Sequence, residues 1–216
     1  PNPVDHCDVV TSTTHKTLRG PRSGFVLSRK EFANDLNRTT FPGMQGGPLV
    51  HVIAAKAVCF KQAMYAEFKE YARQIVVNAL ALADTLTGEG FRLVSGGTDN
   101  HLILVDMAAM GVTGKEAEEA LGKAGMTVNK NTIPFDEKPP MVASGIRVGT
   151  PAVTTRGMTE EEMRWIGRWM ARAIRNRDDD ATLEDIAKSV RELCAGFPVS
   201  PRLLSPSYVS MLKTGR

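Results

Sequence analysis

One uninterrupted stretch of helical periodicity, from about Leu49 to Leu86, constrains the fold of this chain most strongly. Apolar residues recur through it at helical spacing, and neither glycine nor proline interrupts it. Helices of globular proteins are usually far shorter. The pattern therefore predicts a kink, or a crossing between two domains, within the stretch.

The segments on either side of the long helix favour an α/β fold with two domains. Before it, we expect two short buried strands, a short helix and an irregular Gly/Pro segment, at residues 8–12, 25–28, 30–37 and 39–48. After it, we expect strands at 91–94, 101–106, 127–128 and 146–148, and helices at 113–124, 159–177 and 182–195. Thr113 and Glu116 have the spacing of a capping box. The predicted domains are half of a doubly wound sheet in residues 1–65, a small α/β sandwich in residues 66–196 and an irregular tail in residues 197–216.

The composition excludes several classes of protein. A net charge of +3 is too small to indicate nucleic-acid binding, and no apolar run is long enough to cross a membrane. Three cysteines without metal-ligand spacing fit a reducing cytoplasm, and we expect Cys59 and Cys194 to lie in a core. Because the chain lacks an initiator Met and enters a strand within a few residues, we expect a fragment of a longer protein.

Lys16 follows a short apolar strand and a hydroxyl-rich turn in the segment VVTSTTHKTLRGPRSG, residues 9–24. A lysine at the end of a buried strand can act as a Schiff-base nucleophile, because desolvation favours its neutral amine. Enzymes that use pyridoxal 5'-phosphate (PLP) hold their cofactor with such a lysine. A lone lysine after a strand is more often solvated surface, and His15 alone is more often structural.

A Gly/Pro loop, FPGMQGGP at residues 41–48, precedes the long helix. Gly46 and Gly47 would let backbone N–H groups approach a phosphate closely, and a helix N-terminus favours an anion. The same pair is also common in plain turns.

Two later segments carry side chains suited to binding small molecules. The loop VNKNTIPFDEKPPM, residues 128–141, can present amide edges to a heterocycle. In SGIRVGTPA, residues 144–152, a strand arginine between glycines can bind a carboxylate through two parallel hydrogen bonds. An ordinary surface loop and a structural ion pair are the alternatives.

Taken together, these four segments resemble the motifs of the serine hydroxymethyltransferase family, in the same order and nearly letter for letter. The resemblance extends from residue 1 to about residue 199 and corresponds to roughly the C-terminal half of that family. It implies part of the large domain of a PLP transferase of the aspartate aminotransferase type, followed by a small C-terminal α/β domain.

The resemblance also implies roles for individual residues. Lys16 would hold PLP, with His15 and Thr13 as neighbouring catalytic residues and Arg22 supporting His15 and the cofactor. Gly46 and Gly47 would contact the PLP phosphate of a neighbouring subunit, which implies a homodimer or tetramer with shared active sites. The roles in substrate binding fall on Arg147 for the carboxylate of serine or glycine, and on Asn131, Pro139, Pro140 and Met141 for tetrahydrofolate.

The activity implied is reversible transfer of the serine hydroxymethyl group to tetrahydrofolate, in the cytoplasm. A related PLP aldolase or an α-methylserine-type hydroxymethyltransferase is one alternative, although the match at Asn131 argues against an aldolase that needs no folate. A non-catalytic remnant that acts by subunit association is another, against which the retained Lys16, Arg22 and Arg147 argue. The family's remaining catalytic groups precede residue 1, so we expect the isolated chain to be inactive.

Overall fold

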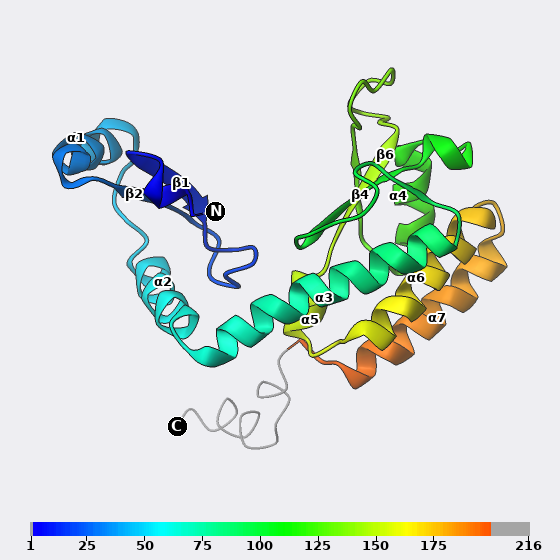
Figure 1. Ribbon diagram of the computed structural model, residues 1–216. Coiled ribbons are helices and arrows are strands. Elements are labelled where there is room, and N and C mark those ends of the chain that lie inside the picture. The colour runs from blue at the N-terminus through cyan, green and yellow to red at the C-terminus, as the bar shows by residue number, and fades with distance from the viewer. Residues whose placement is uncertain (1, 200–216) are drawn as a thin grey trace. The chain divides into compact units, whose positions relative to one another are not determined.

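The computed structural model describes residues 2–199 of the chain, which divide into two compact units (Figure 1). The boundary falls between Ala72 and Arg73, inside a long helix. The chain is a mixed α/β protein, as the sequence predicts. The assignment of residues 1–65 and 66–196 to domains of a larger PLP-transferase fold stays a prediction.

The first unit contains a two-stranded antiparallel sheet and several helices. Its elements are η1 (Pro3–Asp5), β1 (Val9–Thr13), β2 (Gly24–Ser28), η2 (Lys30–Phe32), α1 (Ala33–Arg38), the wide π-type turn η3 (Thr39–Met44) and α2 (Val50–Ala63). Both predicted strands are confirmed, and they pair from Val9 opposite Ser28 to Thr13 opposite Gly24. The prediction that they are buried is wrong, because few described side chains cover them and most of their residues are exposed.

The long helical stretch breaks once, which confirms the predicted kink. Helix α2 ends at Ala63 and α3 (Ala66–Gly88) begins three residues later. The backbone N–H groups of Met64 and Tyr65 donate to the carbonyls of Lys61 and Gln62, at 3.2 and 3.1 Å. These hydrogen bonds join residues three positions apart instead of the four of an α-helix. The backbone is therefore wound more tightly here, and α2 ends.

The second unit is built on a four-stranded antiparallel sheet. The strands β3 (Arg92–Leu93), β4 (Leu102–Asp106), β5 (Asn129–Asn131) and β6 (Gly145–Gly149) lie in the order β3-β4-β6-β5. The other elements are η4 (Ala108–Met110), α4 (Gly114–Lys123), α5 (Pro151–Thr155), α6 (Glu160–Arg175) and α7 (Asp180–Gly196). The predicted strand at 127–128 is wrong, because Val128 packs into the core and pairing with β6 begins only at Asn129.

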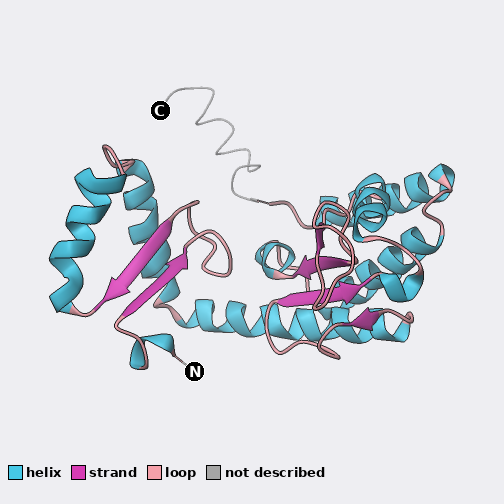
Figure 2. Ribbon diagram, turned by 90° about the horizontal axis from the view of Figure 1, so that it is seen from above, coloured by secondary structure: helices cyan, strands magenta, loops and turns pink. Residues whose placement is uncertain are grey.

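The core of the second unit lies on one face of this sheet, whose strands are drawn in magenta in Figure 2. Side chains alternate between the two faces of a strand, and Ile103, Val105 and Ile146 are at most 1% exposed. Helices α3, α4, α6 and α7 complete this core with Leu82, Leu86, Leu121, Met163, Met170, Ile174, Leu183 and Ile186. In the first unit, by contrast, the buried apolar residues among those described are Cys59 and Tyr71.

The start of α4 is fixed by its cap and by a close approach to β6. The predicted capping box is confirmed, since Thr113 Oγ1 accepts from the N–H of Glu116 and Glu116 Oε2 accepts from that of Thr113. Gly114 lies directly against the backbone of Gly145, and a Cβ on Gly114 would sit 2.3 Å from the Gly145 carbonyl oxygen. Only glycine permits this contact.

Of the predicted tail, residues 200–216 lie outside the described residues, whereas Phe197 packs against the core. Within residues 2–199, none of the helices combines the length and the apolar character that crossing a bilayer requires.

We expect Gly114→Ala to lower the free energy of unfolding of the second unit by about 2–3 kcal/mol, because α4 must shift away from β6. Gly122→Ala on the same helix is the matched control, since a Cβ there meets no atom within 4 Å and removing a helical glycine is worth up to about 1 kcal/mol. Urea unfolding followed by circular dichroism measures both. Equal stabilities of the two variants would contradict the close approach.

Candidate functional site

The turn between β1 and β2 carries Lys16, and Thr14 closes it. The fully buried hydroxyl of Thr14 is shared between the carbonyls of Pro21, at 2.6 Å, and Ser23, at 3.2 Å. The backbone N–H of Thr14 also donates to Ser23 O at 3.0 Å. These contacts hold the two limbs of the turn together, two residues before Lys16.

The same turn rests on helices of the first unit. A Cβ on Gly20 would lie 2.5 Å from Cys59 Sγ, and this thiol donates to Leu18 O at 3.3 Å. Burial raises the pKa of the Cys59 thiol, and the positive charge of Arg19 opposes that effect only in part. The Arg19 guanidinium lies 4.2 Å from the ring centroid of Tyr71, a cation–π contact. The backbone around Lys16 is therefore fixed by α2 and by the start of α3.

The predicted cofactor side chains on this turn are available to a ligand. Lys16 and Arg22 are exposed, and their side chains form no hydrogen bond or ion pair within residues 2–199. His15 is half-buried, and its Nδ1 lies 3.4 Å from Ser23 O. Thr13 is half-buried at the end of β1, opposite Gly24. An amine, an imidazole, a hydroxyl and a guanidinium thus gather on one short turn.

Gly46 and Gly47 lie between η3 and α2 and are exposed. A Cβ on either would meet no atom within 4 Å. A hollow of about 550 Å³ lies nearby in the same unit, lined in part by Ser12, Ser23, Gln45 and Lys56. None of the predicted cofactor residues lines this hollow, and within residues 2–199 no cluster of three potential metal ligands occurs.

In the second unit, strand pairing brings Arg147 and Asn131 onto one face of the sheet. Asn129 stands opposite Arg147, and Asn131 stands opposite Gly145. Directly opposed residues of antiparallel strands point to the same side, so all of these lie on the face away from the core. Arg147 is exposed and has no acidic partner among the described residues, so the structural ion pair considered for it is absent there.

The loop between β5 and β6 carries Pro139, Pro140 and Met141, all exposed, and Asp136 organises it. Its carboxylate accepts from Ile133 N, Lys138 N, Ser144 N and Ser144 Oγ, at 2.6–3.1 Å. The hydroxyl of Ser144 is the main reason that the pKa of Asp136 lies far below its usual range. The lowered pKa means that the ionised Asp136 stabilises the folded chain. This contribution is fully present above the ordinary aspartate pKa of about 4, and it is lost as the pH falls from there through the lowered pKa of the folded state.

Sequence reasoning missed Asp136 and the structural role of Thr14. An aspartate that accepts from the N–H two residues later forms an Asx turn, and this is the local signal that could have revealed Asp136. The contacts of Thr14 with Pro21 and Ser23 join residues seven and nine positions apart, and no local pattern marks them.

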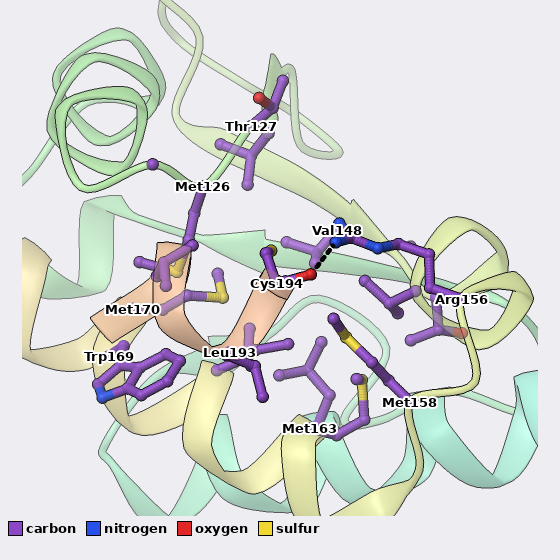
Figure 3. A pocket seen from close by; sticks show the side chains of 18 residues that line it. Met126, Thr127, Val148, Arg156, Met158, Met163, Trp169, Met170, Leu193 and Cys194 are labelled. Carbon is purple, nitrogen blue, oxygen red and sulfur yellow. Dashed lines mark hydrogen bonds between the residues drawn. The ribbon is translucent and has the colours of Figure 1, made fainter. Parts of the chain in front are cut away.

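An apolar cavity of about 280 Å³ lies inside the second unit, on the core side of β6 (Figure 3). Met158, Met163, Trp169 and Leu193 are among its lining residues, and no predicted site residue is. The one guanidinium at its wall, that of Arg156, donates to the carbonyls of Cys194 and Phe197 at 2.9 and 2.6 Å. This arginine therefore caps the end of α7. The free thiol of Cys194 is also among the lining residues of the cavity.

Known proteins match this chain over nearly its whole length. The family model described as serine hydroxymethyltransferase matches residues 1–170. The chain is similar to proteins named serine hydroxymethyltransferase from Koribacter versatilis (60% identical; 93% of this chain and 47% of that protein), Methanospirillum hungatei (58%; 94% and 49%) and Myxococcus xanthus (61%; 99% and 49%). It spans about half the length of these curated relatives.

Alkylation of thiols at pH 8 is expected to modify Cys7 at least about tenfold faster than Cys59, because Cys7 is exposed and the Cys59 thiol is buried with a raised pKa. Thr14→Ala should open the turn and speed the modification of Cys59. Thr17→Ala, in the same turn but without a hydrogen bond among the described residues, is the control. Mass mapping of cysteine peptides over time gives the rates, and an unchanged Cys59 rate in Thr14→Ala would show that Thr14 does not close the turn.

Proposed function

Because the chain belongs to the serine hydroxymethyltransferase family, we propose that it carries the cofactor lysine and the substrate-binding arginine of a PLP-dependent transferase. The proposed reaction breaks the Cα–Cβ bond of serine and passes its one-carbon unit to tetrahydrofolate. The products are glycine, 5,10-methylenetetrahydrofolate and water, and a proton replaces the lost carbon at Cα.

The observation that carries this proposal is the shared face of β5 and β6. Arg147 and Asn131 lie there on adjacent strands, with no described acid neutralising the guanidinium. An exposed arginine on a rigid strand suits a planar carboxylate, because its two parallel N–H groups match the two oxygens. An asparagine amide on the same face can both donate to and accept from a pterin ring.

The donor set of the first unit fits PLP. The amine of Lys16 has no partner among the described residues, and the guanidinium of Arg22 is likewise free to meet an anion. The two carbonyl contacts of Thr14 hold the backbone that presents them. When bound, PLP supplies an electron sink for the electron pair released at Cα.

The roles of the chain's own residues follow from these placements. Lys16 would hold the cofactor, and Thr13 would hydrogen-bond near its amine while the substrate amine takes its place. His15 would lie beside the cofactor, supported by Arg22. Arg147 would fix the amino-acid carboxylate, which orients Cα and selects α-amino acids.

Tetrahydrofolate would bind to Asn131 and to the loop that carries Pro139, Pro140 and Met141. The exposed and unobstructed Gly46 and Gly47 suit the phosphate of a second subunit, so we propose a homodimer or tetramer with shared active sites. The protein would act in the cytoplasm, without nucleic acid or membrane as a partner.

The alternatives are a related PLP aldolase, an α-methylserine-type hydroxymethyltransferase and a non-catalytic remnant, and no observation in the structure favours any of them. We further propose that the 216 residues alone do not turn serine over, because they correspond to about half of each relative. Measurable serine cleavage by the pure chain would refute this.

Borohydride reduction in the presence of PLP, followed by peptide mass mapping, tests the role of Lys16. We expect a stable adduct on Lys16 that Lys16→Arg abolishes, since the guanidinium is not nucleophilic. Lys30→Arg, another exposed lysine in the first unit, should leave the adduct unchanged. An adduct spread evenly over several lysines would contradict the assignment of Lys16 as the cofactor lysine.

In the complete enzyme, Arg147→Lys is expected to raise the KM for serine by about 10–100-fold, because a point charge replaces a bidentate pair. Arg168→Lys, on the exposed side of α6, should leave the KM within about twofold. Steady-state kinetics with saturating tetrahydrofolate measures both. An unchanged KM for serine in Arg147→Lys would remove this residue from the carboxylate site.

A further inference from the structure

The loop between β5 and β6 has an exposed tip, and hydrogen bonds hold its two limbs together. Phe135 is fully exposed and Met141 is 75% exposed, so the apolar tip has little packing to hold it. An exposed loop with so little packing ordinarily samples several conformations. Its order must therefore come mainly from hydrogen bonds rather than from apolar packing.

The outgoing limb of the loop is tied independently to the rest of the second unit. The N–H groups of Gly114 and Lys115, at the start of α4, donate to the carbonyls of Ala143 and Val142 at 2.9 and 3.0 Å. Met107, just after β4, donates to Ser144 O at 2.9 Å. This limb runs directly into β6 and so to Arg147.

The tip is joined to this limb by backbone hydrogen bonds, since the N–H groups of Val142 and Ala143 both donate to Pro139 O at 2.9 Å. One side chain, that of Asp136, adds hydrogen bonds to the incoming limb, the tip and the outgoing limb together. One oxygen of Asp136 accepts from Ile133 N on the incoming limb and from Ser144 N on the outgoing limb. The other oxygen accepts from Lys138 N at the tip and from Ser144 Oγ. Within residues 2–199, Asp136 is the side chain whose hydrogen bonds connect these three parts of the loop.

We propose that Asp136 is a positioning residue for the folate co-substrate: its carboxylate holds the segment Pro139–Met141 in a fixed place relative to Asn131 and β6. The proposal rests on the proposed function. Asp136 itself touches neither substrate nor cofactor, and it acts through the backbone N–H groups that it accepts from.

The hydrogen bonds of Asp136 can be tested with a single substitution that keeps the size of the side chain. Because all four contacts of Asp136 are accepted, Asp136→Asn places an NH₂ group against donors and breaks the contacts of at least one carboxylate oxygen. Glu137→Gln is the matched control: it removes the same charge from the adjacent exposed position, which has no hydrogen bond among the described residues.

The test uses the complete enzyme loaded with PLP and makes three measurements on wild type, Asp136→Asn and Glu137→Gln. Hydrogen exchange of residues 132–144 reports the order of the loop. Calorimetric titration with tetrahydrofolate, in the presence of glycine, reports the co-substrate affinity. Titration with glycine alone reports the carboxylate site at Arg147.

In Asp136→Asn we expect exchange to speed up at least tenfold at the N–H groups that lose their acceptor, either those of Ile133 and Ser144 or that of Lys138. We expect the Kd for tetrahydrofolate to rise at least tenfold. The Kd for glycine should stay within twofold, and Glu137→Gln should resemble wild type in all three measurements. Unchanged exchange, an unchanged folate affinity, or an equal loss of both affinities would overturn the positioning role. A wild-type enzyme that binds no tetrahydrofolate would instead overturn the proposed function on which this role rests.

Discussion

The antiparallel pairing of β6 with both β4 and β5 is the interaction on which the second unit depends. It places Ile146 in the core and Arg147 on the opposite face, because successive residues of a strand point to opposite sides. Slipping the register by one residue would bury the guanidinium and expose the isoleucine. The same ladder that stabilises the core thus determines which side chains can meet a ligand.

Glycine makes this arrangement compact. A Cβ on Gly145 would lie 2.7–2.8 Å from Ile133 Cγ2 and Val105 O, and Gly114 lies directly over the Gly145 carbonyl. The sheet, the first turn of α4 and the β5–β6 loop therefore converge on one short piece of backbone. The neighbouring Ser144 is held at the same point: its carbonyl accepts from Met107 N, and its N–H and hydroxyl donate to Asp136.

The first unit positions its candidate residues by other means. It buries little apolar surface among the described residues, and the Lys16 turn is held by the hydroxyl of Thr14 and by the contact of Gly20 with Cys59. Hydrogen bonds and one close approach replace a core there. This leaves Lys16 and Arg22 exposed on a backbone whose path is nevertheless defined.

From the sequence alone, the periodicity of residues 49–86 predicted a broken helix, the Thr113–Glu116 spacing predicted a capping box, and four motifs indicated the family. Each of these signals is local in the chain, which is why it could be interpreted without coordinates. The exposure of β1 and β2, the start of β5 at Asn129 and the hydrogen bonds from Ser144 to Asp136 depend instead on which segments pack or pair in space. Only the tertiary structure decided them, because burial and strand register are properties of neighbours in space rather than of neighbours in sequence.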